Sequence, residues 1–313
     1  MPTRKIQFIA NTTYSVSLPK EWIIKNNLEP KSEVRISETK EKDLLISNIR
    51  KKRDESTEIK LSLRDDEEDI EEIMMACYHR GFEKITIKSD SYITKKEKEI
   101  LSKIANKMTG TEVSFEKDRM VIKNILDHKK LDLRQTLYRT SLFLQESLRS
   151  IIDGNPDLVE IKQNEKEINR LAHLAMKVCS LATRNTGLLT ASRIDDSDHL
   201  LYFLDIIKEL ENLGDHILLI AENANDREDA TKLRILEDLS HELKNTMEFI
   251  ISNKRKRFRK MDKKKLKRME NHTRKIVDGA CRMNMQEILR CVMRIEDSTL
   301  AESFLERNAE LTK

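Results

Sequence analysis

The sequence predicts an α+β fold, mostly α-helical: a small β-rich N-terminal module, a small α/β domain and a duplicated three-helix bundle. Three observations predict this fold. The 313 residues exceed the size at which one core stops growing, about 250–300 residues. The apolar pattern changes from strand-like alternation to helical spacing along the chain. The chain has only 6 Gly and 4 Pro but 36% charged residues, which favours a helix-rich protein with few turns.

Residues 1–52 predict a module with the order β-β-α-β-β. Apolar and polar side chains alternate around residues 6–18 and 34–46, a pattern typical of half-buried strands. Pro19 suits the first turn of a short helix between them, and Asn26 can end that helix. Because so short a chain buries little surface alone, we expect a homodimer to complete its core.

Residues 57–126 predict a small α/β domain. Ile59, Leu61 and Leu63 alternate as in a strand, and residues 70–78 have helical spacing up to the natural cap Gly81. A strand, a second helix and two short strands follow. No Gly-rich phosphate loop is present.

Residues 131–313 predict the bundle, with a first half at 131–225 and a second half at 228–311. Apolar residues recur there every three to four positions, as in bundle helices. We expect the last two helices at about 262–283 and 285–311. Two successive three-helix units suggest an internal duplication.

Composition and spacing argue against several classes of function. A net charge of +4 does not by itself imply a nucleic-acid partner. No apolar run is long enough to span a membrane, and the N-terminus lacks the pattern of a signal peptide. The cysteines share no CxxC spacing, so we expect buried thiols and a cytoplasmic protein. No nucleophile stands beside an orienting base, so we expect no enzyme. The four cysteines are Cys77, Cys179, Cys281 and Cys291.

The segment Tyr14–Trp22, which contains Ser-Leu-Pro-Lys-Glu-Trp, resembles the AbrB/SpoVT-like DNA-binding module. The resemblance covers about residues 3–48 and implies a dimer of the swapped-hairpin type with DNA as a partner. Carried over by position, it implies that Arg4, Lys5 and Lys20 contact DNA.

The charge of this module agrees in part with DNA binding. Residues 1–52 contain eleven Lys and Arg against six Asp and Glu, a surplus that favours phosphate contacts and salt-sensitive binding. The alternative is a dimerisation module that does not bind DNA.

A pair of carboxylates marks the first half of the bundle. Glu211 and Asp215 are four residues apart, so they lie side by side on one helix, beside its apolar stripe. Such a pair repels unless something positive lies nearby, for which a metal with oxygen ligands or Lys208 are alternatives. A solvated helix edge is the third possibility. Gly214 in mid-helix indicates a close helix contact.

The stretch Glu211–His216, continued by Ile220-Ala221-Glu222-Asn223, resembles the PhoU phosphate-uptake regulators. The resemblance spans about residues 131–311 and implies a partner motif on the preceding helix, where Glu165 matches but Asn169 replaces the second acid. It implies at most one weakened site for a divalent or iron-type metal, at Glu165, Asn169, Glu211 and Asp215. In the second half, Glu296 is followed by Leu300 where an acid would stand, so that site looks lost.

The order of modules resembles fusion regulators of archaea, which also carry the pattern found at Tyr78–Ile85. The resemblance implies a phosphate-responsive transcriptional or signalling regulator of phosphate homeostasis, with components of a phosphate transporter or sensor kinase as partners. The alternative is an adaptor for such a transporter or kinase that never binds DNA. A metal-dependent hydrolase using Glu211 and Asp215 ranks last.

A basic run extends from Lys254 to Arg268, with eleven Lys and Arg and one acid, Asp262. It could contact nucleic acid, an anionic membrane surface or an acidic partner. It lies where two bundle helices join, and we favour a solvated corner between them.

Overall fold

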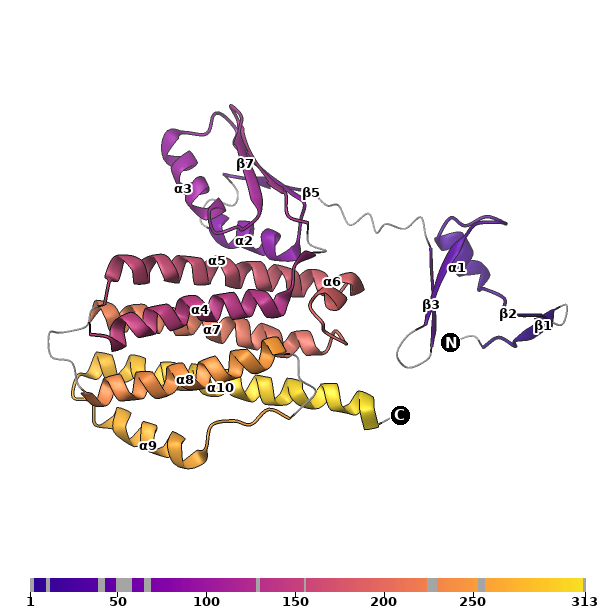
Figure 1. Cartoon of the computed structure of the whole chain (residues 1–313). Coiled ribbons are helices and arrows are strands. Elements are labelled where there is room, and N and C mark those ends of the chain that lie inside the picture. The colour runs from indigo at the N-terminus through magenta and orange to yellow at the C-terminus, as the bar shows by residue number, and fades with distance from the viewer. Residues whose placement is uncertain are drawn as a thin grey trace. The chain divides into compact units, whose positions relative to one another are not determined.

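The computed structural model describes nine segments: residues 3–9, 12–38, 43–48, 58–64, 69–127, 130–154, 156–223, 230–252 and 257–311. The chain divides into two compact units, residues 1–57 and residues 58–313 (Figure 1). The first unit contains the N-terminal module. The second contains both the small α/β domain and the helical bundle.

The N-terminal module has the predicted order β-β-α-β-β. Strand β1 (Gln7–Ile9) pairs with β2 (Thr13–Ser15), and β3 (Val34–Glu38) pairs with β4 (Leu44–Asn48), both antiparallel. Helix α1 (Lys20–Lys25) lies between the two hairpins in sequence and ends at Asn26, followed by Asn27 with a left-handed φ of 50°. Asparagine tolerates this conformation better than most residues, which explains why the helix stops there.

The N-terminal module has little core of its own. Leu28 is its buried apolar side chain among the described residues, at 8% exposure. Large apolar side chains in or next to its strands and helix are instead between 48% and 73% exposed: Ile6, Phe8, Ile9, Tyr14, Val16, Ile24, Ile36, Leu44 and Leu45. A single copy of the module therefore leaves most of its apolar surface in water.

The small domain is a four-stranded sheet with two helices. The strand order is β5-β6-β8-β7, with β5 parallel to β6 and the other pairs antiparallel. Met74, Ile87 and Met120 are fully buried in its core. The elements are β5 (Glu58–Ser62), α2 (Ile70–Arg80), β6 (Lys84–Lys88), α3 (Lys95–Ala105), β7 (Thr111–Phe115) and β8 (Arg119–Asn124).

The bundle follows with six long or medium helices and one short one. They are α4 (Leu133–Ile152), α5 (Leu158–Ala182), α6 (Thr186–Ala191), α7 (His199–Glu222), α8 (Ala230–Ser252), α9 (Lys263–Arg274) and α10 (Gly279–Leu311). The short helix α6 was not predicted. Helices α4, α5 and α7 form the first half, and α8, α9 and α10 form the second half.

The two halves share one apolar core. Helix α4 packs on α8 and α7 packs on α10, so the two halves meet along these four helices. Helix α5 and helix α9 lie at opposite outer faces of the bundle (Figure 1). Helix α2 of the small domain packs against α5. The small domain therefore covers one outer face of the bundle.

The expected helix at about 262–283 is wrong in its extent. Helix α9 ends at Arg274, and α10 begins at Gly279 rather than near residue 285. The cause is Asp278, whose Oδ1 accepts hydrogen bonds from the backbone of Ala280 at 2.8 Å and Cys281 at 3.1 Å. Such a cap satisfies the free N–H groups of a new helix and breaks the preceding one.

The four cysteines are buried thiols, as predicted. Among the helices that the structure describes, none combines the length and the apolar character that a membrane crossing requires.

Candidate functional site

Helices α5 and α7 bring three predicted acids within electrostatic reach of one another. Glu165 lies on α5, while Glu211 and Asp215 lie on α7; we call these three the acidic cluster. Gly214 is buried where the helices meet, and a Cβ added there would lie 3.3 Å from the side chain of Ile168. The close helix contact predicted from this glycine is confirmed.

Burial raises the pKa of every carboxyl in the acidic cluster, although Asp215 stays exposed, and repulsion between the acids adds to the effect for Glu165 and Glu211. For Glu165, partial burial acts first and the charge of Asp215 second. The pKa of Glu211 is raised by burial, then by Asp215 and Glu165, while burial is the main cause for Asp215. A cation placed among these groups would relieve the repulsion.

Asn169 lies beside the acidic cluster, and its amide N–H group faces Glu165. Its Nδ2 donates to Glu165 Oε1 at 2.5 Å, while its Oδ1, the atom that could ligate a metal, is buried without a partner in the described part of the chain. Across the described residues, no three His, Cys, Asp or Glu side chains converge as metal ligands. A divalent or iron-type metal at Glu165, Asn169, Glu211 and Asp215 stays a prediction.

The small domain contributes charge to the acidic cluster. Lys107, which follows α3, acts to lower the pKa of both Glu165 and Glu211. Its Nζ lies 2.5 Å from Glu71 Oε1 on α2, so it remains within its own domain. Lys107 is therefore a positive charge from the small domain that acts on two of these acids.

A buried lysine joins the small domain to the bundle. Lys177 of α5 is fully buried, with Nζ 3.2 Å from Asn124 Oδ1 and 4.2 Å from the centroid of the Tyr78 ring. Burial lowers the pKa of Lys177 to about 8 and raises that of Tyr78 far above its ordinary range. Tyr78 Oη donates to Thr109 O at 2.9 Å. The ring face and the amide oxygen are the groups that stabilise the ammonium here.

Two histidines meet at the same interface. His79 Nε2 of α2 lies 3.2 Å from His173 Nδ1 of α5, a hydrogen bond that requires one ring nitrogen to donate and the other to accept. Burial lowers both pKa values, that of His173 to about 4, and the charges of Lys177 near His79 and Lys107 near His173 add to the effect. The fold therefore favours the neutral form of both rings.

The second half of the bundle has its own acids. Lys265 Nζ lies 3.1 Å from Asp238 Oδ1 and 2.8 Å from Glu242 Oε1, so an ammonium stands between two carboxylates one helical turn apart. Glu296 is buried and accepts a hydrogen bond from the backbone N–H of Met261 at 3.0 Å. Burial raises its pKa to about 7.

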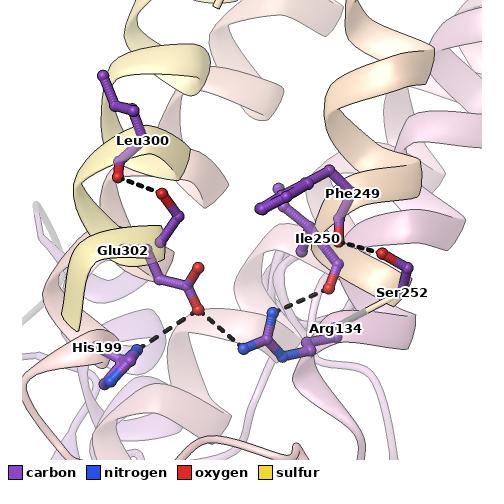
Figure 2. Close-up of polar contacts among 8 residues, drawn as sticks. Arg134, His199, Phe249, Ile250, Ser252, Leu300 and Glu302 are labelled. Carbon is purple, nitrogen blue, oxygen red and sulfur yellow. Dashed lines mark hydrogen bonds and ion pairs between the residues drawn. The ribbon is translucent and has the colours of Figure 1, made fainter. Parts of the chain in front are cut away.

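A buried charge network closes the bundle (Figure 2). Arg134 donates through Nη2 to Glu302 Oε1 at 2.8 Å and through Nη1 to Ile250 O at 2.9 Å. His199 Nδ1 lies 3.5 Å from the same carboxylate oxygen. Burial acts to raise the pKa of Glu302, but the adjacent His199 and the charge and hydrogen bond of Arg134 outweigh it and lower the pKa. The network joins α4, α7, α8 and α10.

The predicted DNA contacts lie on the N-terminal module. Arg4 and Lys5 precede β1, and Lys20 is the first residue of α1. All three side chains are exposed, and Arg4 has a hydrogen bond to the neighbouring Thr3 O at 3.3 Å. Exposure leaves them accessible to a phosphate backbone. Their role in DNA binding stays a prediction.

Sequence reasoning missed the charged groups that pair over long distances. The i, i+4 spacing of Asp238 and Glu242 could have drawn attention to that pair, as it did for Glu211 and Asp215. No local signal marks Arg134 or Lys177, because their partners come from other parts of the chain.

The fold and the candidate site define a helical-bundle protein with paired acids on neighbouring helices and a β-rich module ahead of the bundle. Residues 133–224 match the PhoU domain, and residues 7–56 match the domain described as antidote-toxin recognition MazE, bacterial antitoxin. The chain thus combines a MazE/AbrB-like N-terminal domain with a PhoU domain, as the sequence predicted. Both are regulatory, non-catalytic families.

The PhoU match covers helices α4 to α7, which include the acidic cluster, and leaves the second half outside it. No curated protein and no solved structure matches the chain.

Proposed function

We propose that this protein is a phosphate-responsive regulator that binds DNA through paired N-terminal modules and senses phosphate status through its bundle. The observation that carries the proposal is the pairing of a MazE/AbrB-like domain with a PhoU domain in one chain. The first family is linked to DNA or toxin–antitoxin binding and the second to regulation of phosphate homeostasis.

The exposed apolar side chains of the N-terminal module support pairing with a second copy. Ile36 is 60% exposed on β3, and Leu44 and Leu45 are 67% and 58% exposed on β4. Burying such side chains stabilises an assembly by about 25 cal/mol for each Å² removed from water. A small module whose described residues include one buried apolar side chain gains a core most directly from a second copy, as in a swapped-hairpin dimer.

The charge of the module supports DNA as the partner. Arg4, Lys5 and Lys20 are exposed, and the segment 1–52 has a surplus of basic residues. Lysine and arginine contacts to phosphates release bound counterions, so binding of this kind weakens as salt rises. Sequence readout would come from other side chains.

The acidic cluster supports a sensing role for the bundle. Asp215 raises the pKa of both Glu165 and Glu211, and Lys107 of the small domain acts to lower the pKa of the same two groups. A bound cation, with or without phosphate, would change this balance and could shift α5 relative to the small domain. Only a ligand that binds two arrangements with different affinity can shift the equilibrium between them.

The experiment is a mobility-shift assay at low salt with the full chain and with Arg4, Lys5 and Lys20 replaced by alanine. The proposal predicts weaker DNA retention in the variant. A matched control replaces the exposed Lys95, Lys96 and Lys103 of α3, which changes the charge equally and should leave retention as it is.

The alternative function is an adaptor that contacts a phosphate transporter or sensor kinase, in the cytoplasm, without DNA. The adaptor function predicts that neither the wild-type chain nor the Arg4, Lys5 and Lys20 variant retains DNA in the mobility-shift assay. Metal analysis of the purified chain, with Glu211→Gln and Asp215→Asn variants as controls, tests the predicted metal separately. A bound divalent or iron-type metal that is lost in the variants would support it, and a metal-free chain would overturn it.

A further inference from the structure

Helix α9 presents a continuous basic face on the outside of the bundle. Its members are exposed and have a spacing that places them on one side of the helix, with the last of them just after its end. They are Lys263, Lys264, Lys267, Arg268, Arg274 and Lys275, with the exposed Asn271 among them, and we call them the basic face. The opposite side of α9 carries the buried Met269 and Thr273, which pack toward α8 and α10. The basic face is therefore fixed on a packed helix, away from the small domain.

The cations of the basic face lack partners within the described part of the chain. Lys265, on the inner side, is held by Asp238 and Glu242, and Lys260 pairs with Asp297. No ion pair joins the six cations of the basic face to a described carboxylate. The 12 residues of α9 extend over about 18 Å, and the half-buried Glu270 lies at the edge of this face, so the face carries a clear surplus of positive charge.

We propose that the basic face of α9 is a second DNA-binding surface, which contacts the phosphate backbone of duplex DNA without reading its sequence. Duplex DNA carries one negative charge per about 1.7 Å of its axis, so a row of cations on a rigid helix meets several phosphates at once. The basic face contains no aromatic side chain, so it has no means of stacking on bases. Asn271 can add a hydrogen bond to a phosphate oxygen.

An anionic membrane is the less suitable partner. A helix that lies in a membrane interface inserts its apolar side among the acyl chains. The apolar side of α9 is already buried in the bundle through Met269, so only electrostatic attraction would remain. A duplex needs nothing more than charge for non-specific binding.

The inference rests on the proposed function, since it places a second contact on a chain whose N-terminal module holds DNA. Two contacts on one chain raise the local concentration of the second site once the first is bound. The basic face would then strengthen binding without adding sequence preference.

The test measures the affinity of the full chain for a fluorescent 30-base-pair duplex by anisotropy between about 50 and 200 mM salt. The variant carries Lys263→Gln, Lys264→Gln, Lys267→Gln and Arg268→Gln. The charge-matched control carries glutamine at the exposed Lys95, Lys96, Lys103 and Lys117. Because these side chains are exposed, both proteins should keep the wild-type thermal midpoint, which is measured first.

Each lost phosphate contact lowers the slope of log affinity against log salt by about 0.9. We expect the slope of the α9 variant to fall by roughly 2–4 and that of the control to stay within about 0.5 of wild type. An unchanged slope in the α9 variant overturns the inference, as does an equal fall in the control. Loss of binding to vesicles containing anionic lipid, with DNA binding intact, would instead assign the face to a membrane.

The Arg4, Lys5 and Lys20 alanine variant separates the two proposals. If this variant binds DNA as wild type does while the α9 variant binds more weakly, the proposed role of the N-terminal module is wrong and the proposed role of the basic face is supported. If only the N-terminal variant has a weaker DNA affinity, the proposal for the basic face is wrong and the proposed role of the N-terminal module is retained.

Discussion

Arg134 Nη2 lies 2.8 Å from Glu302 Oε1, so a buried ion pair joins the first helix of the bundle to the last (Figure 2). The side chains are 2% and 3% exposed. Since Arg134 also donates to Ile250 O on α8, the guanidinium holds three helices together. The pair closes the bundle across 168 residues of chain.

Glu302→Leu should destabilise the bundle by about 3–5 kcal/mol, because it leaves the charge of Arg134 buried without its partner. Urea unfolding of the full chain measures the loss. Asp90→Asn is the matched control, since it breaks the exposed Arg64–Asp90 pair at a comparable distance of 3.1 Å and should cost less than about 1 kcal/mol. Equal losses in the two variants would show that burial does not matter here.

Glu296→Gln should stabilise the protein at pH 8 and have little effect at pH 5. Burial raises the pKa of Glu296 to about 7, so the folded protein favours the neutral carboxyl, and stability falls as pH rises from the ordinary pKa of 4.5 through 7. Glutamine stays neutral and can still accept the hydrogen bond from Met261. The expected gain at pH 8 is on the order of 1–3 kcal/mol in unfolding free energy. A gain of the same size at pH 5 would contradict this explanation.

The interface between α2 and α5 should weaken in acid through His79 and His173. Both pKa values lie below the ordinary 6.5, that of His173 at about 4, so the fold favours neutral rings. This contribution is complete above pH 6.5 and is lost as pH falls toward 4. Lys177 and Lys107 increase the repulsion on protonation, while Glu71 opposes it at His173.

His173→Gln should therefore reduce the loss of stability between pH 6.5 and 4, since glutamine cannot be protonated there. The quantity to compare is the difference in thermal midpoint between wild type and variant at several pH values, because the carboxyls with raised pKa values, in the acidic cluster and at Glu296, add a pH dependence that both proteins share. A difference that does not change with pH would rule out the histidine pair as the cause.

Leu45→Glu should convert the protein to a monomer. Leu45 is 58% exposed on β4 of the isolated module, and a charge placed there would be buried without a partner if two modules pair. Sedimentation of the full chain reports the mass, with Thr12→Glu at an exposed loop position as the control that should stay paired. If wild type is itself monomeric at micromolar concentration, pairing through this surface is wrong.

Local patterns predicted most of the fold. Alternation predicted the four short strands of the N-terminal module, and Gly81, with a φ of +85°, ends α2 as expected. The break between α9 and α10 was predicted near residue 284 instead of before Gly279, because apolar residues lie on both sides of the capping Asp278, so the apolar pattern continues across the true break.

The candidate site could be predicted only in part. Glu211 and Asp215 are one turn apart on α7, a local relationship that the sequence displays directly. The influence of Lys107 on these acids and the burial of Lys177 depend on how the small domain packs on α5. Tertiary packing of that kind leaves no trace in local spacing.

The most direct test of the account is the mass of the complex between the full chain and a labelled duplex, measured by sedimentation at low salt. We predict two chains of 36.8 kDa for each duplex, released as salt is raised. A duplex that sediments unchanged in the presence of the protein, or a complex with one chain, would contradict the claim that paired N-terminal modules bind DNA.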